Sequence, residues 1–196
     1  NPNSKIKKQF EILMAKDFIV AIELGSSKIT GIAGKKNPDG SITVLSVAKE
    51  DSKACMRKGV VYNIDKTAQA LTNIINKLKG SLQTDIARVY VGVGGQSLKG
   101  VKNVVVKDLP ADSIVTQDIV NELMDTNRNM KNNDYEVLDA ITQEYKVDML
   151  DELNPVGVQA CHIEGNFLNL LWRKTFNRSL NKCFDNAGIP IVEMYV

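Results

Sequence analysis

The chain has 196 residues, of which 43% are hydrophobic and 24% are charged, and its formal net charge is +2. This composition supports a packed core in one domain or two small ones and excludes a largely disordered chain. It contains no run of about 18 apolar residues and no signal-like apolar stretch at its start, so neither a transmembrane helix nor secretion is expected. The irregularly spaced Cys55, Cys161 and Cys183 predict free thiols in a reducing cytosol rather than a disulfide framework.

Charge divides the chain into a basic and an acidic part. Residues 1–106 carry a net charge of +9, and residues 107–153 carry a net charge of −8. This asymmetry predicts two structural units with opposite surfaces. Between copies the two surfaces would attract one another and favour head-to-tail assembly, with simple solvation of both as the alternative. No aromatic-rich basic stripe of the kind that stacks bases is present, so we expect no nucleic-acid partner.

The first half predicts a sheet with one helix. Residues 1–16 are expected to be a flexible N-terminal extension or residues added in cloning, with a basic membrane- or partner-binding helix as the alternative. Apolar and β-branched runs predict three strands joined by tight turns, followed by a helix and a fourth strand. Asp65 is the expected N-cap of the helix, and Gly80 is its expected end. The four strands are expected at residues 18–24, 29–33, 41–48 and 87–93.

The second half predicts a separate β-α-β-β unit that coincides with the acidic part. Its helix is expected to begin at Thr116, whose hydroxyl is a good N-cap. A further helix and a last strand follow, separated by Gly188 and Pro190. The strands of the unit are expected at 98–106, 136–147 and 158–171, its helix at 116–129, and the last helix and strand at 173–187 and 191–196. The order of elements predicts an α/β fold of mixed α+β character.

The turn after the first strand is the strongest candidate for a ligand site. Glu23 lies near the end of a buried strand, and Gly25 opens a tight turn. Backbone amides in such a turn can hold an anion, to which Ser26 and Ser27 can add hydroxyl donors and Lys28 a positive charge. Glu23 could orient a water molecule on Mg²⁺. An ordinary hairpin turn with solvated serines fits the same residues.

Other chemical signatures are weak. No Walker loop is present, and residues 92–95 lead into a strand rather than a helix, which favours a hinge over a ligand loop. His162 has neither a second histidine nor a Gly-x-Ser-x-Gly elbow to support it, so we expect no zinc site and no catalytic triad. Glu136 and Asp139 have odd separation and are expected on opposite faces of a strand, which favours a solvated protein-binding face over an acid–base pair.

Several segments together resemble the FtsA family of bacterial cell-division proteins, within the actin/Hsp70-type nucleotide-binding proteins. The resemblance extends over nearly the whole chain after residue 16 and keeps the family's order. Its most specific part is the pair Gln-Glu-Tyr at 143–145 and Asn-Pro-Val-Gly at 154–157. The other matching segments are at 22–28, 56–60, 89–95 and 115–120.

The resemblance implies half of an actin-like (ribonuclease H-like) nucleotide-binding domain with an inserted β-α-β-β subdomain. Residues 17–96 and 172–196 would form the incomplete first lobe, and residues 97–171 would form the insert. The resemblance also implies ATP with Mg²⁺ as the cofactor of the full-length protein. The first phosphate loop would then be Gly25, Ser26, Ser27 and Lys28, and Glu23 would act on Mg²⁺ through water, with no catalytic residue in this chain.

Members of this family bind ATP, polymerise, tether FtsZ to the cytoplasmic side of the inner membrane and recruit later division proteins. The resemblance implies the same location and partners here, with recruitment through residues 97–171. It implies a scaffold with at most weak ATPase activity rather than an enzyme. The family's second phosphate loop, FtsZ-binding lobe and C-terminal membrane helix would lie after residue 196, so we expect a fragment with little affinity for ATP. The alternatives are an actin-like type IV pilus assembly protein and a sugar kinase of the same superfamily.

Overall fold

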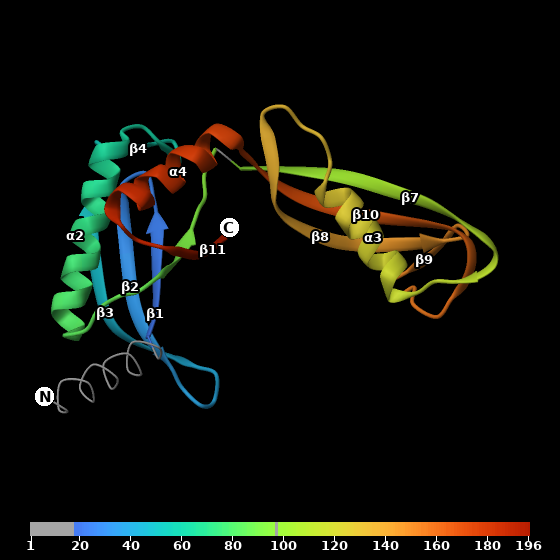
Figure 1. Ribbon diagram of the computed structural model, residues 1–196, viewed down its shortest axis with the longest axis horizontal. Coiled ribbons are helices and arrows are strands. Elements are labelled where there is room, and N and C mark those ends of the chain that lie inside the picture. The colour runs from blue at the N-terminus through green and yellow to red at the C-terminus, as the bar shows by residue number, and fades with distance from the viewer. Residues whose placement is uncertain (1–17, 97) are drawn as a thin grey trace, which may run out of the picture. The chain divides into compact units, whose positions relative to one another are not determined.

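The computed structural model describes residues 18–96 and 98–196, which form two compact units (Figure 1). Unit 1 combines the described part of Asn1–Ser97 with Phe176–Val196, and unit 2 is Leu98–Thr175. The chain therefore leaves unit 1, builds unit 2 and returns. The extension predicted over residues 1–16 lies outside the described residues. Within the described residues, no helix has both the length and the apolar character needed to cross a membrane.

Unit 1 is built on a five-stranded sheet in the order β11-β6-β1-β2-β3 (Figure 1). Strands β1, β2 and β3 form an antiparallel meander, whereas β6 and β11 run parallel to β1. The predicted mixed α/β fold is therefore confirmed. The bounds of the strands are β1 (Phe18–Leu24), β2 (Lys28–Lys36), β3 (Ile42–Asp51), β6 (Val89–Gly92) and β11 (Ile191–Tyr195), and a small hairpin of β4 (Met56–Arg57) and β5 (Val60–Val61) follows β3.

Helix α2 (Ile64–Leu82) packs on β2 and β3 through an apolar stripe that includes Leu71, Ile74 and Leu78. Two predicted details of this helix are wrong. Its N-cap is Asn63, whose Oδ1 accepts a 2.9 Å hydrogen bond from the backbone nitrogen of Lys66, while Asp65 lies in the first turn. The helix also runs past Gly80, and Gln83 ends it with a left-handed backbone (φ 53°). Asn63 and Asp65 have similar capping chemistry, so composition does not separate them. The helix continues through Gly80 because a single glycine in a helix costs only about 1 kcal/mol.

Helix α4 (Lys174–Ala187) supplies the second apolar stripe of unit 1, made of Phe176, Leu180, Cys183 and Phe184. Burial raises the pKa of the Cys183 thiol to about 11. Cys55 is also buried, and burial raises its pKa, whereas Cys161 is exposed. All three cysteines are free thiols, as the sequence predicts.

Unit 2 has its own antiparallel sheet in the order β7-β10-β8-β9, with helix α3 (Gln117–Arg128) packed against three of its strands (Figure 1). The strands are β7 (Leu98–Ile114), β8 (Tyr135–Val147), β9 (Leu150–Glu152) and β10 (Gln159–Arg173). Strand β7 is longer than predicted and contains Pro110, which an edge strand tolerates because one side of it needs no ladder partner. The core beneath α3 contains Val115, Leu123, Tyr145, Val147, Ala160, Ile163 and Phe167.

A buried pair of amides joins α3 to this sheet. The side chains of Asn127 and Asn169 are fully buried and exchange two hydrogen bonds, of 2.7 and 2.8 Å. Asn103 on β7 donates a third, of 2.9 Å, to Asn127. Because each buried amide has a partner, the polar groups fix the position of the helix end rather than destabilise the core.

Candidate functional site

Parallel strands β1 and β6 place two predicted turns at one edge of the unit 1 sheet. Glu23 on β1 is the register partner of Gly92 on β6. The chain continues from β1 into the turn of Gly25, Ser26, Ser27 and Lys28, called the 25–28 turn below, and from β6 into residues 93–95. Ligands of open α/β sheets bind beyond the carboxyl ends of the strands. The structure therefore brings the two glycine-containing turns to the edge where a ligand would be expected.

The 25–28 turn is closed by its own backbone. The nitrogen of Gly25 donates a 3.0 Å hydrogen bond to the oxygen of Lys28. A Cβ atom at Gly25 would lie 2.7 Å from that oxygen, so only glycine fits there. Among the described residues, the amides of Ser26 and Ser27 and the Ser27 hydroxyl have no hydrogen-bond partner, and Lys28 has no ion pair. The turn thus presents exposed donors and one positive charge, which is the chemistry of an anion site.

Ser26 has a structural role that the sequence did not predict. Its Oγ accepts a 2.9 Å hydrogen bond from the backbone nitrogen of Gly59. Gly59 has a left-handed backbone (φ 77°), and a Cβ atom there would lie 2.7 Å from the oxygen of Gly94 and 2.9 Å from the Cα of Gly95. Three loops therefore meet at van der Waals distance, and the hydroxyl hydrogen of Ser26 remains free to donate.

Ser52 holds the 25–28 turn in place, and the sequence did not predict this role either. It is fully buried, its Oγ donates a 2.7 Å hydrogen bond to the oxygen of Gly25, and its nitrogen donates a 3.2 Å bond to the oxygen of Ser27. The oxygen of Ser52 accepts from the nitrogens of Cys55 and Met56. One serine thus ties the turn to the segment that follows β3. No local sequence signal marks it, because Ser52 follows the charged residues Lys49, Glu50 and Asp51.

Glu23 is exposed, and the described residues give it no ion pair. No group of three His, Cys, Asp or Glu side chains among the described residues could hold a metal ion. A single carboxylate can still act on Mg²⁺ through water when phosphates supply other ligands, because Mg²⁺ keeps several of its waters. The residues present therefore fit an indirect contact with the ion and do not form a protein cage for it.

The remaining candidates lie in unit 2. The Nδ1 of His162 lies 2.7 Å from Oδ1 of Asp108, and this hydrogen bond raises the pKa of the imidazole. Glu136 and Asp139 are opposite Trp172 and Leu170, which share one face of β10. The predicted placement of these carboxylates on opposite faces is therefore wrong, because a β-bulge at this point adds one residue to β8.

Comparison with known proteins decides the family. Residues 95–171 match the family described as "SHS2 domain inserted in FTSA". The chain is 32% identical over 162 residues to the cell division protein FtsA of Porphyromonas gingivalis, covering 81% of this chain and 34% of that protein. This chain is FtsA-like. The FtsA of Neisseria meningitidis is 25% identical over 174 residues, which cover 88% of the FtsA-like chain and 42% of that relative.

A solved structure supports the same fold for the FtsA-like chain. The "PilM-PilN type IV pilus biogenesis complex" aligns with a TM-score of 0.57 and 12% identity, covering 91% of this chain and 47% of that one. At this identity the likeness concerns the fold alone, which is actin-like. The FtsA-like chain spans about a third to two fifths of the length of the curated relatives it matches.

Proposed function

We propose that this chain contributes the first phosphate loop of an ATP site in an FtsA-like cell-division protein. Gly25, Ser26, Ser27 and Lys28 would hold phosphate oxygens through backbone amides, hydroxyls and one ammonium group. Glu23 would orient a water molecule on Mg²⁺. The observation that carries the proposal is the closed 25–28 turn, whose donors are exposed and uncommitted at the carboxyl edge of parallel strands.

The FtsA relatives favour a role in cell division, and we propose that this role is that of a scaffold on the inner membrane. In this proposal the full-length protein polymerises, anchors FtsZ and recruits later division proteins through unit 2, with at most weak ATPase activity. The pilus-assembly alternative rests on the fold alone, whereas the FtsA relatives match in sequence over most of the chain. This difference favours division over pilus assembly.

Nucleotide titration of the full-length protein tests the ATP site. Ser27→Ala and Lys28→Ala each remove an exposed group that has no side-chain partner in the described part of the chain, so the fold should persist. We expect each to weaken binding of a fluorescent ATP analogue by about tenfold, the loss of roughly one charge-assisted hydrogen bond. Lys36→Ala, an exposed lysine elsewhere in unit 1, is the matched control and should leave affinity unchanged.

Three results would each contradict a part of the proposal. Equal affinity of the loop variants and the Lys36→Ala control would remove the 25–28 turn from the site. Micromolar ATP binding by the 196-residue chain alone would contradict the expectation that it holds only half of the site. A fluorescent fusion of the full-length protein should form a ring at mid-cell, and its absence there would contradict the division role.

A further inference from the structure

Unit 2 contains a polar hollow at the C-terminal end of α3. It is lined by residues 128–133, by the start of β8 and by Lys174, and its volume is about 400 Å³. Ligand pockets commonly have volumes of about 300–1,000 Å³. The hollow is therefore large enough for a few residues of a bound peptide.

Hydrogen bonds within unit 2 hold one wall of this hollow in place. Nζ of Lys174 donates a 2.7 Å hydrogen bond to the oxygen of Asn132, and the backbone nitrogen of Lys174 donates to the oxygen of Asp134 at 2.9 Å. Oδ1 of Asn132 accepts from the nitrogens of Asp134 and Tyr135, at 3.0 and 2.9 Å. A wall that is ordered before binding lowers the entropy cost of holding a ligand.

Positive charge gathers at the hollow although unit 2 as a whole is acidic. Unit 2 holds eight Lys and Arg residues against thirteen Asp and Glu. Arg128, Lys131 and Lys174 nevertheless line the hollow, and Glu136 is the one carboxylate among its lining residues. Arg128 and Lys131 are exposed, and the described residues offer neither of them an ion pair. These two cations are therefore available to an anionic ligand.

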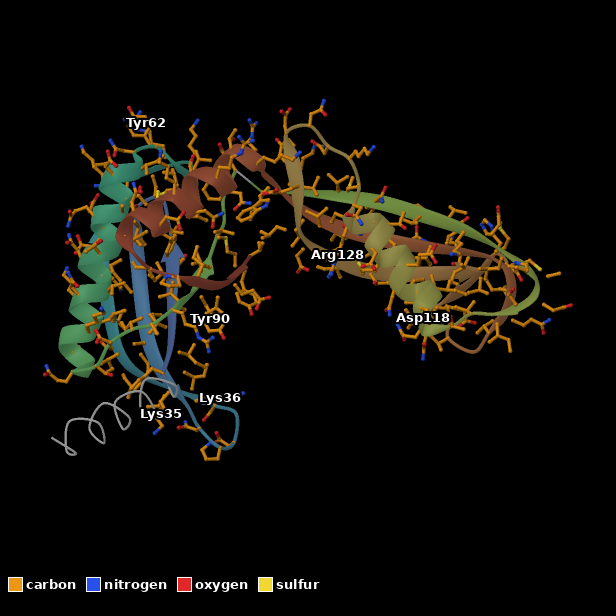
Figure 2. The ribbon with its side chains drawn as sticks, in the orientation of Figure 1. Lys35, Lys36, Tyr62, Tyr90, Asp118 and Arg128 are labelled. Atoms are coloured by element: carbon orange, nitrogen blue, oxygen red, sulfur yellow. The ribbon has the colours of Figure 1, made fainter. Side chains whose placement is uncertain are left out.

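The ring of Tyr135 brings two further cations near the hollow. The Arg173 guanidinium lies 5.6 Å from the ring centroid, and Nζ of Lys99 lies 5.9 Å from it. Five of the eight cations of unit 2 thus belong to this one region. Arg128 lies at the end of α3 that adjoins the hollow, and Asp118 lies at the other end (Figure 2).

We propose that this hollow binds an acidic peptide segment of a partner protein. Carboxylates of the segment would pair with Arg128 and Lys131, and the side-chain amides of Asn129 and Asn133 would donate to its backbone oxygens. Helix α3 ends at Arg128, so the negative end of its dipole adjoins the hollow. This end disfavours a doubly charged phosphate group more than the separate single charges of peptide carboxylates. Binding of an acidic segment rests on the hollow alone, whereas a division protein as the source of that segment rests on the recruiting role proposed for unit 2.

Fluorescence anisotropy with the purified chain tests the inference. The probe is a short labelled peptide of alternating Glu and Gly, and a Lys-Gly peptide of equal length is its control. The double variant Arg128→Gln/Lys131→Gln removes two exposed charges, and Lys35→Gln/Lys36→Gln removes the same number from the exposed end of β2 in unit 1 (Figure 2). We expect the first pair to weaken binding of the acidic peptide by about tenfold and the second by less than about twofold.

Three outcomes would overturn the inference. The first is that the acidic peptide binds no better than the basic one. The second is that the two double variants bind the acidic peptide equally well. The third is that inorganic phosphate or phosphatidylglycerol vesicles bind through Arg128 while the peptide does not. Circular dichroism of each variant checks that the fold is intact. Peptide binding in solution without recruitment of division proteins in cells would instead contradict the recruiting role alone, so the two failures are distinguishable.

Discussion

The hydroxyl of Ser52 donates a 2.7 Å hydrogen bond to the backbone oxygen of Gly25, across 27 residues of sequence. This bond joins the end of β3 to the candidate phosphate turn, and Ser52 is fully buried at the junction. A turn that must present its amides to a ligand needs such support, because its own closure rests on one hydrogen bond between Gly25 and Lys28.

Ser52→Ala should destabilise unit 1 by about 1–3 kcal/mol, because it leaves the oxygen of Gly25 without its buried partner. Urea unfolding followed by circular dichroism measures the change as a lower midpoint at unchanged slope. The matched control is Ser81→Ala, an exposed serine of α2, which should stay within about 0.5 kcal/mol of the original chain. Equal midpoints for the two variants would show that Ser52 does not hold the turn.

Gly59→Ala should be far more costly than Gly40→Ala, although both glycines have positive φ angles, of 77° and 85°. The left-handed backbone costs a non-glycine residue about 1–2 kcal/mol at either position. Only at Gly59 would the new Cβ atom also collide with backbone, at 2.7 Å from the oxygen of Gly94, whereas nothing lies within 4 Å at Gly40.

Thermal unfolding of the two variants separates backbone strain from collision. The Gly59→Ala variant should also weaken nucleotide binding in the full-length protein, because Ser26 accepts from the nitrogen of Gly59. A Gly59→Ala variant as stable as Gly40→Ala would mean that the three loops do not meet as closely as described.

Local sequence patterns predicted most of the helices and strands, but few of the contacts between loops that hold the candidate site in place. The apolar runs of β1 and β3 and the stripe of α2 are long enough for their period to be recognised. Strands β4, β5 and β9 were missed because two or three residues carry no period.

The composition of the 25–28 turn indicated a tight turn, which the structure contains, while its role with phosphate stays a prediction. The contacts of Ser26 with Gly59 and of Gly25 with Ser52 connect residues 33 and 27 positions apart. Such long-range contacts depend on how the elements pack, and no local pattern of residue types encodes them. The bulge in β8 was missed for a related reason, since it depends on pairing with β10.

The amide pair of Asn127 and Asn169 should show strong coupling in a double-mutant cycle. Replacing either asparagine by alanine removes both hydrogen bonds of the pair, at a cost of about 1–3 kcal/mol, while Asn127 in the Asn169→Ala variant keeps the hydrogen bond from Asn103. The double variant should cost less than the sum of the single variants, because the second replacement removes an amide that has already lost the hydrogen bonds of the pair. Urea unfolding of the four proteins measures the coupling. Additive effects would show that the pair contributes no shared stability.

His162 should titrate above its ordinary pKa of about 6.5 in the folded chain, chiefly because Asp108 accepts a hydrogen bond from its imidazolium. Because folding raises the pKa of His162, the ion pair contributes its full stability at pH values below the pKa of His162 in the unfolded chain. This contribution is lost as the pH rises through the folded pKa. Unit 2 should therefore become less stable over that interval. Asp108→Asn should move the pKa downward and remove most of this dependence.

Proton NMR measures this titration directly, because His162 is the only histidine of the chain and gives a single imidazole signal. Glu164, whose Oε1 lies 3.4 Å from Nε2 of His162, also raises the pKa and explains why Asp108→Asn should leave a smaller residual shift. The matched control is Asp112→Asn, an exposed carboxylate of the same strand that bonds Gln159 instead. An unchanged titration in Asp108→Asn, or an equal change in the control, would contradict the cross-strand pair.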